Sequence, residues 1–154
     1  MEIGIREATI NDAEILFDWA NDPETRHNSF NSGSIDWNDH IRWLKNKLND
    51  PASKIYILHT KEKPVGVVRF EINETTVIGV TVAPDHRGMG LGAEILKTAC
   101  NTFWKNNVVS ILAYIKKGNI ASQRVFEKAG FTFLREDKVN NNECLILKAT
   151  KHAH

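Results

Sequence analysis

Apolar and polar residues alternate along seven short stretches of the chain, and a period of two residues predicts β-strands. The second, third and fourth stretches follow one another through short polar turns, which favours an antiparallel meander. The fifth comes after a helix-forming segment, so we expect it to lie parallel to the fourth. The predicted strands cover residues 3–8, 54–60, 64–72, 76–82, 110–115, 131–136 and 143–149.

Four other segments repeat apolar residues every three or four positions, which is the period of an amphipathic helix. The first begins after Asn11 or Asp12 and the second after Asp36, because these side chains are good helix caps. The third follows a glycine-rich loop, and the fourth ends at Gly130, where glycine tolerates a left-handed backbone. Residues 21–33 lack this period and have the composition of a loop.

These segments predict an α+β chain with a mostly antiparallel sheet of about seven strands and about four flanking helices. At 154 residues the chain fits one domain, which we assign to 1–150 with a polar tail at 151–154. The 20 basic and 19 acidic residues nearly cancel, so no long-range field favours nucleic acid or a membrane as partner. We expect a cytoplasmic protein because the chain shows neither a membrane-spanning apolar run nor a signal pattern.

The two cysteines are too few for a disulfide framework. Cys100 lies in a predicted helix and Cys144 in a predicted strand, so we interpret both as packing thiols. The six histidines show neither metal-ligand spacing nor the order of a Ser-His-Asp triad. We therefore expect no metal in this protein.

Three glycines, Gly88, Gly90 and Gly92, lie between the predicted strand at 76–82 and the helix that follows. A helix N-terminus presents free backbone N–H groups, and glycines let an anion approach them closely, so the loop is a candidate pyrophosphate site. A turn that serves geometry alone is the other interpretation. The loop lacks the Lys-Ser or Lys-Thr pair of a P-loop and the acidic residue of a dinucleotide fold.

Two motifs resemble those of the GNAT superfamily of N-acetyltransferases. Arg87, Gly90 and Gly92 match its acyl-CoA loop, and residues 119–131 are similar to its later motif of Asn, Ser, an aromatic residue and Gly-Phe. The resemblance implies a GNAT-like acyl-CoA N-acyltransferase fold and acetyl-CoA as co-substrate. It also implies three groups of residues that hold acetyl-CoA. Backbone from Arg87, Gly88, Met89, Gly90, Leu91, Gly92 and Ala93 would bind the pyrophosphate, Val82 and Ala83 would pair with the pantetheine arm, and Asn119, Ser122 and Phe126 would line the other side.

The proton donor and the base of the reaction are less clear from the sequence. The superfamily often has a tyrosine at the position of Phe126 and a glutamate near Val77 or Ile78, and neither residue type is present here. Tyr114, Glu71 and His40 are the alternative catalytic candidates. Each has a structural alternative: packing for the tyrosine, a solvated strand end for the glutamate, and a hydrogen-bonded core position for the histidine.

The acceptor should lie against the first two helices and the loop between them, residues 17–44. This segment resembles acetyltransferases that modify amino-sugar nucleotides on the way to nonulosonic acids such as pseudaminic acid. We expect Arg26 to meet phosphates, Ser29 to bind a hydroxyl, and Phe30 or Trp37 to lie against a sugar. A small-molecule amine is thus the expected partner. Protein N-termini, polyamines and a non-catalytic acyl-CoA-binding role remain alternatives, and a monomer and a homodimer are both open.

Overall fold

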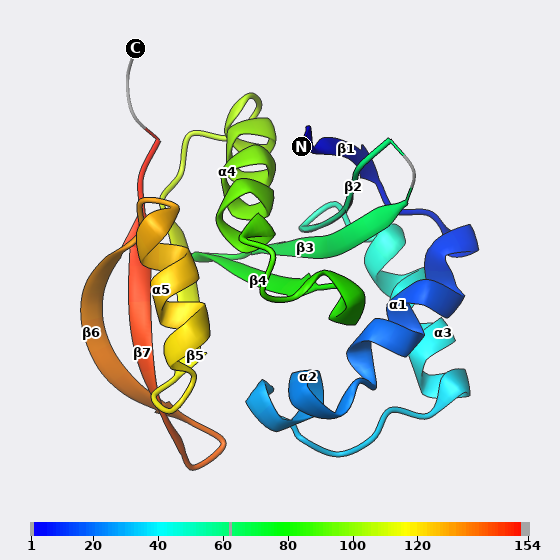
Figure 1. Cartoon of the computed structure of the whole chain (residues 1–154), viewed down its shortest axis with the longest axis horizontal. Coiled ribbons are helices and arrows are strands. Elements are labelled where there is room, and N and C mark those ends of the chain that lie inside the picture. Colours follow the sequence, from blue (N-terminus) through cyan, green and yellow to red (C-terminus); the bar gives the residue numbers. More distant parts are fainter. Residues whose placement is uncertain (1, 62, 152–154) are drawn as a thin grey trace.

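A seven-stranded sheet forms the centre of the computed structural model, which describes residues 2–61 and 63–151 (Figure 1). The strand order is β1-β2-β3-β4-β5-β7-β6, and all neighbours are antiparallel except β4 and β5. This arrangement confirms the predicted α+β fold; of the predicted tail, 152–154 lie outside the described residues. The strands are β1 (Gly4–Glu7), β2 (Ser53–His59), β3 (Pro64–Ile72), β4 (Thr76–Val82), β5 (Ile111–Lys116), β6 (Thr132–Val139) and β7 (Asn142–Ala149).

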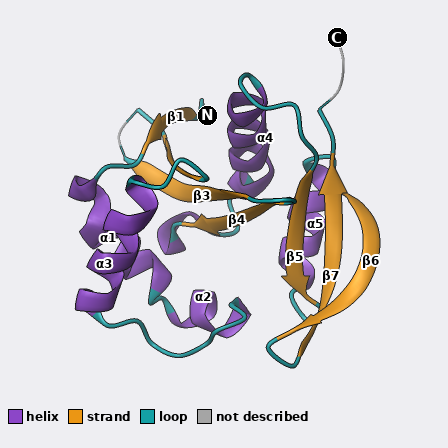
Figure 2. Ribbon diagram, turned by 180° about the vertical axis from the view of Figure 1, so that it is seen from behind, coloured by secondary structure: helices purple, strands orange, loops and turns teal. Residues whose placement is uncertain are grey.

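Five α-helices cover the two faces of the sheet (Figures 1 and 2). The helices α4 and α5 lie on one face, where α4 contacts the strands from β1 to β4. On the other face, α1 and α3 pack against each other, and α3 contacts β2. The helices are α1 (Ala13–Ala20), α2 (Pro23–Asn28), α3 (Trp37–Leu48), α4 (Leu91–Trp104) and α5 (Ile120–Lys128), with short 3₁₀ turns η1 (Ile10–Asp12) and η2 (Pro84–His86).

The helix α2 corrects the expectation of a loop over 21–33 and raises the count of helices from four to five. The Asp22 carboxylate caps it by accepting a hydrogen bond from the Thr25 backbone N–H at 3.2 Å, and Pro23 stands at its first position. Both are helix-start signals. None of the six residues is buried, so α2 has no apolar stripe by which periodicity could have revealed it.

Two hydrophobic clusters lie on opposite faces of the sheet. The larger one joins β3 to α4, where the rings of Phe70 and Phe103 stack with centroids 4.2 Å apart. The smaller one joins Leu44 of α3 to Ile57 of β2. Cys100 is buried in the larger cluster, and burial raises its thiol pKa to about 12, so it is an inert packing group as predicted.

The helix starts follow the predicted caps only in part. Asp36 caps α3 as expected, accepting hydrogen bonds from two backbone N–H groups. At the other start, Asp12 stands at the N-cap of α1, but its side chain makes no capping hydrogen bond to that helix, and Thr9 caps the preceding turn η1. Asp12 instead pairs with Arg6 of β1 at 2.8 Å, and this guanidinium holds the pKa of its carboxyl below the ordinary value. The pair ties the first strand to the first helix.

Gly92 has a structural role that the sequence did not reveal. A Cβ added at this position would lie 2.8 Å from Cγ1 of Val125, so the glycine allows α4 and α5 to approach closely. Valine is branched at Cβ and cannot easily move its methyl groups away. Gly92 is therefore required for helix packing, independently of any ligand at the loop.

We expect Gly92→Ala to lower the free energy of unfolding by about 1–2 kcal/mol, since overpacking forces the helices apart. Chemical denaturation measures this change. In the double variant with Val125→Ala the penalty should shrink, because the clashing methyl groups are gone. Gly118→Ala is the matched control, as no atom of the described residues lies within 4 Å of a Cβ added there. Equal losses with and without Val125→Ala would contradict the packing explanation.

Candidate functional site

The sheet opens between its two central strands. The parallel pairing of β4 with β5 covers only three residue pairs and ends at Ile78 and Ala113. Beyond that point β4 stays paired with β3, and β5 stays paired with β7. The two strands diverge there, as both ribbon views show (Figures 1 and 2). Each half of the sheet thus has an inner edge next to a central opening.

Backbone polar groups line both edges of this opening. The Ala83 N–H donates to the Val65 carbonyl at 2.8 Å, so it faces β3. Because backbone groups alternate along a strand, Val80 and Val82 point theirs the other way, into the opening. The Lys117 N–H donates to the Glu143 carbonyl at 3.0 Å, and the same alternation turns the backbone of Tyr114 toward the opening. The sheet therefore offers free edge groups to an extended amide-bearing molecule.

The N-terminus of α4 lies directly after β4 and η2 and has no side-chain cap. Gly88 and Gly90 have left-handed backbones with φ of 75° and 74°, and no described atom lies within 4 Å of a Cβ added at either. The first-turn N–H groups of a helix have no intrahelical partners and attract anions. The predicted anion site thus has open space beside uncapped N–H groups.

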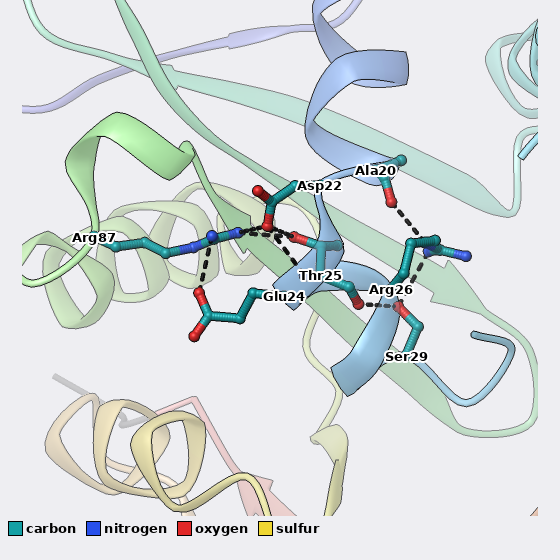
Figure 3. Close-up of polar contacts among 7 residues, drawn as sticks. All are labelled: Ala20, Asp22, Glu24, Thr25, Arg26, Ser29 and Arg87. Atoms are coloured by element: carbon teal, nitrogen blue, oxygen red, sulfur yellow. Dashed lines mark hydrogen bonds and ion pairs between the residues drawn. The ribbon is translucent and has the colours of Figure 1, made fainter. Parts of the chain in front are cut away.

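The Arg87 side chain does not point to this loop but to α2 (Figure 3). Its Nη2 lies 2.7 Å from Asp22 Oδ2 and donates to Thr25 Oγ1 at 2.9 Å, while Nη1 lies 2.9 Å from Glu24 Oε2. Arg87 thereby lowers the pKa of the Asp22 carboxyl. Its charge is already matched by carboxylates, so the predicted phosphate role is left to the backbone of the loop.

The helix α2 also contacts the other side of the opening. Lys116 at the end of β5 donates from Nζ to the His27 carbonyl at 2.8 Å. The chain just after α2 reaches the β6–β7 turn, where Asn140 Nδ2 donates to the Phe30 carbonyl at 3.3 Å. Together with Arg87 on the β4 side, these contacts hold α2 across the two halves of the sheet.

A family model described as "Acetyltransferase (GNAT) domain" matches residues 2–132. The chain belongs to the GNAT acetyltransferase family. It is 31% identical over 145 residues to acetyltransferase PseH of Campylobacter jejuni subsp. jejuni serotype O:23/36 (strain 81-176), covering 90% of this chain and 88% of the relative. It is 30% identical to PseH of a second strain, serotype O:2 (strain ATCC 700819 / NCTC 11168), covering 90% and 89%.

Solved structures share the fold of this acetyltransferase at lower identity. One is aminoglycoside acetyltransferase AAC(6')-Ib in complex with ribostamycin and coenzyme A, at 17% identity and a TM-score of 0.86, covering 98% of this chain and 94% of the other. Another is spermidine N-acetyltransferase from Vibrio cholerae in complex with CoA and spermine, at 14% and 0.85, covering 96% and 95%. Their likeness supports the predicted fold.

Arg26 and Ser29, which we predicted to bind the acceptor, are engaged within their own segment (Figure 3). Arg26 donates to the carbonyls of Ala20, Asn31 and Gly33 and to Ser29 Oγ, at 2.6–3.2 Å. The Ser29 hydroxyl donates to the Thr25 carbonyl at 2.7 Å. The structure thus gives both side chains a role in shaping the turn after α2, and it offers no support for Arg26 as a phosphate ligand.

Trp37 and Phe30, the aromatic residues predicted to contact the acceptor, lie in different surroundings. Trp37 at the start of α3 is 42% exposed and makes an edge contact with Phe17, with ring centroids 5.1 Å apart. Phe30 is partly exposed, and its carbonyl is the group that reaches Asn140. Both remain available to a ligand, and their predicted role in binding stays a prediction.

His40 is a core residue of the acetyltransferase. Only 3% of it is exposed, and its Nε2 donates to the Ala13 carbonyl at 2.8 Å, joining α3 to α1. On the next turn Trp43 stacks on its ring at 6.0 Å. The structure therefore supports the alternative we gave for His40, a hydrogen-bonded core histidine, over a catalytic role.

The Glu71 carboxylate is also bound by other side chains of the protein. It pairs with Lys47 Nζ at 3.0 Å and accepts from Ser53 Oγ at 3.4 Å. It lies opposite Val77, in the part of β4 that is still paired with β5. These contacts fix Glu71 to the end of α3, so the structure offers no support for it as the base.

Tyr114 is the catalytic candidate that lies at the opening. It is the first residue of β5 beyond the last pair with β4, and its side chain alternates away from Ala113 and Ile115, which belong to the α4 cluster. It therefore faces the α1–α3 side of the sheet, where Lys116 meets α2. No described residue hydrogen-bonds its hydroxyl.

The predicted acyl-CoA residues on α5 fall into two kinds. Asn119 caps the helix, as its Oδ1 accepts from the Ser122 N–H at 3.2 Å, which leaves its amide N–H₂ unused within the described chain. Phe126 is only 3% exposed and packs edge-on against Phe131 in the core. Ala83 belongs with Phe126, because it is buried and its N–H is bound to Val65. Both residues are buried in the core, Phe126 in the larger cluster and Ala83 in the smaller one.

Two residues at the site were missed by the sequence reasoning: Arg69 of β3 and Trp43 of α3. The Arg69 guanidinium carbon lies 5.2 Å from the centroid of the Trp43 ring. A charged residue inside the apolar run of residues 64–72 was a signal that could have found it. Within residues 2–61 and 63–151, no helix is long and apolar enough to cross a membrane, and no group of metal-binding side chains occurs.

The Asp22–Arg87 pair gives a prediction for acid stability. A carboxyl whose folded pKa is lowered stabilises the fold fully above its ordinary pKa of about 3.9, and this stabilisation is lost as pH falls through the lowered value. Asp22→Asn keeps the cap but loses the charge. We expect the free energy of unfolding of this variant to fall less steeply with acid than that of the parent.

Chemical denaturation at a series of pH values between about 2 and 5 measures this difference. Asp39→Asn is the matched control, because Asp39 also faces an arginine, Arg42, but on an exposed surface. Exposed pairs contribute little, so its acid profile should stay close to that of the parent. Parallel profiles for Asp22→Asn and the parent would show that the link to Arg87 adds no stability.

Proposed function

We propose that this acetyltransferase transfers the acetyl group of acetyl-CoA to a primary amine on an amino-sugar nucleotide. The observation that carries the proposal is the opening between β4 and β5, which leads to the uncapped N-terminus of α4. A long thioester with amide groups in its arm and a pyrophosphate at its far end matches these two features. We further propose that the reaction takes place in the cytoplasm, where acetyl-CoA is available.

Backbone groups do most of the binding of acetyl-CoA in this proposal. The N–H groups from Gly88 to Ala93 hold the pyrophosphate at the start of α4. Val80 and Val82 pair with the pantetheine amides as an added strand would, and the free amide of Asn119 approaches the arm from α5. Val80 replaces Ala83 in the predicted set, because the Ala83 N–H is already bound to β3.

The reaction needs no covalent enzyme intermediate. The neutral amine attacks the thioester carbonyl, a C–N bond forms, the C–S bond breaks, and coenzyme A leaves as a thiolate. The amine loses one proton and the thiolate takes one up. Tyr114 lies on the acceptor side of the opening with no partner for its hydroxyl among the described residues, and we propose that it donates the proton to the thiolate.

Three features support an amino-sugar nucleotide as acceptor. Aromatic rings of Trp37 and Trp43 lie at the α1–α3 side of the sheet, where a sugar or base can stack. The segment over 17–44 carries the sequence features that resemble amino-sugar-nucleotide acetyltransferases. The relatives at 30–31% identity are both named acetyltransferase PseH, and they cover nearly the whole chain.

An acceptor panel tests the function. Free thiol released from acetyl-CoA is followed with 4-amino-sugar nucleotides, with a peptide carrying a free N-terminus and with spermidine, and each product is identified by mass spectrometry. We expect release only with the amino-sugar nucleotides, and a mass gain of one acetyl group on the sugar. Turnover of the peptide or of spermidine, without turnover of any amino-sugar nucleotide, would replace this proposal.

Tyr114→Phe tests the proton donor. We expect kcat to fall roughly tenfold or more, since a positioned acid contributes at least that much, while KM for both substrates stays near the parental value. Tyr56→Phe is the matched control, because Tyr56 is the other of the two tyrosines and packs near Phe70. If both variants keep parental turnover and pH profile, Tyr114 has only a packing role.

A further inference from the structure

Arg69 lies on the acceptor side of the sheet and has no ion-pair partner among residues 2–61 and 63–151. It alternates with Val67, which faces the α1–α3 cluster, so its side chain leaves β3 on that face. It is partly buried, and no described residue forms an ion pair or hydrogen bond with its guanidinium. The carboxylate of Glu71, two residues along the strand, is engaged with Lys47 instead.

The guanidinium lies next to the point where the sheet opens. A Cβ added at Gly79 would be 3.5 Å from Arg69 Nη2, and Gly79 is the first residue of β4 beyond the last pair with β5. This is ordinary van der Waals distance, so the guanidinium lies against β4 at residue 79. Arg69 is therefore beside the place where acetyl transfer is proposed to occur.

Trp43 holds the guanidinium by its face and leaves its edge free. The ring centroid is 5.2 Å from Arg69 Cζ, which is the range of a cation–π contact. The N–H donors of arginine lie in the plane of the group, so stacking on an indole does not use them. A planar fork of donors with a fixed orientation is suited to two parallel hydrogen bonds to a phosphate.

The charge balance around Arg69 favours an anion. Burial lowers its pKa from the ordinary value; Glu71 opposes this shift and Arg26 adds to it. The group nevertheless stays charged, because arginine is not deprotonated in proteins. A partly buried cation without a counter-ion costs the fold free energy, and a bound anion would reduce that cost.

We propose that Arg69 binds the diphosphate of the nucleotide-linked acceptor and so makes the acceptor site selective for anionic amines. This inference rests on the proposed function, because it names the group of the amino-sugar nucleotide that the site recognises. It assigns to Arg69 the phosphate contact that the sequence suggested for Arg26. The same charge repels polyamines, whose several ammonium groups would be desolvated next to a guanidinium.

Binding of uridine diphosphate, measured by calorimetry, tests this inference without any need for turnover. The protein is first saturated with coenzyme A, so that the N-terminus of α4 is not available to the added diphosphate. We expect the parent to bind, Arg69→Met to bind roughly tenfold or more weakly, and Arg69→Lys to fall between them. Arg42→Met, which removes an exposed arginine from α3, is the matched control and should bind as the parent does.

Kinetics with the accepted substrate add a second measurement. Arg69→Met should raise the acceptor KM by a similar factor and leave the KM for acetyl-CoA within about twofold, which also shows that the variant is folded. Equal binding of uridine diphosphate by the parent and Arg69→Met, or no binding by the parent, overturns the role of Arg69. Failure of every amino-sugar nucleotide as acceptor overturns the proposed function instead, and the calorimetric result then still decides the role of Arg69.

Discussion

The arrangement of the whole acetyltransferase depends on one interruption of backbone pairing. After Ile78 and Ala113 the parallel strands β4 and β5 no longer bind each other. Unpaired backbone groups inside a protein are costly unless something else satisfies them. At this opening the proposed partner is the amide-bearing arm of acetyl-CoA. The interruption also divides the sheet into two halves, which different helices must hold in place.

The helix α2 reaches both halves of the sheet. On the β4 side, Asp22, Glu24 and Thr25 receive the Arg87 side chain from the loop that leads to α4. On the β5 side, Lys116 reaches a carbonyl of α2. Arg87 lies beside the predicted phosphate site, but its side chain joins the glycine-rich loop to α2 and so has a structural role. Three short contacts thus connect the glycine-rich loop with α2.

The arginines of the site divide between structure and recognition according to their partners. Arg26 and Arg87 are surrounded by carbonyls or carboxylates of the chain itself. Arg69 has a tryptophan face beneath it and no acceptor oxygen of the described chain at its edge. A charged group that the protein leaves unmatched beside a site is a candidate for ligand binding, whereas a matched one is a candidate for fold stability. Sequence position alone does not make this distinction.

The sequence by itself determined the fold and, apart from α2, the order of the elements, and it predicted an anion site at the glycine-rich loop. These features are local: strand and helix periods, the caps at Asp36 and Asn119, and the turn glycines Gly88 and Gly90 act through near neighbours in the chain. The sequence missed α2 because that helix is stabilised by a cap and a proline rather than by an apolar stripe. The cap at Asp22 and the proline at position 23 are visible in the sequence, but a search for apolar periodicity does not detect them.

Only the tertiary structure decided which polar side chains are free. Arg26, Glu71 and His40 have the right chemistry for a site, but Arg26 is bound by its own segment and the partners of the other two lie 18 to 27 positions away, which spacing cannot reveal. Gly92 looked like part of the phosphate loop, and its contact with Val125 is across two helices. Arg69 became a candidate because the residues around it turned out to be a tryptophan and a glycine. The availability of a group for a ligand is a property of its neighbours in space, which only the fold brings together.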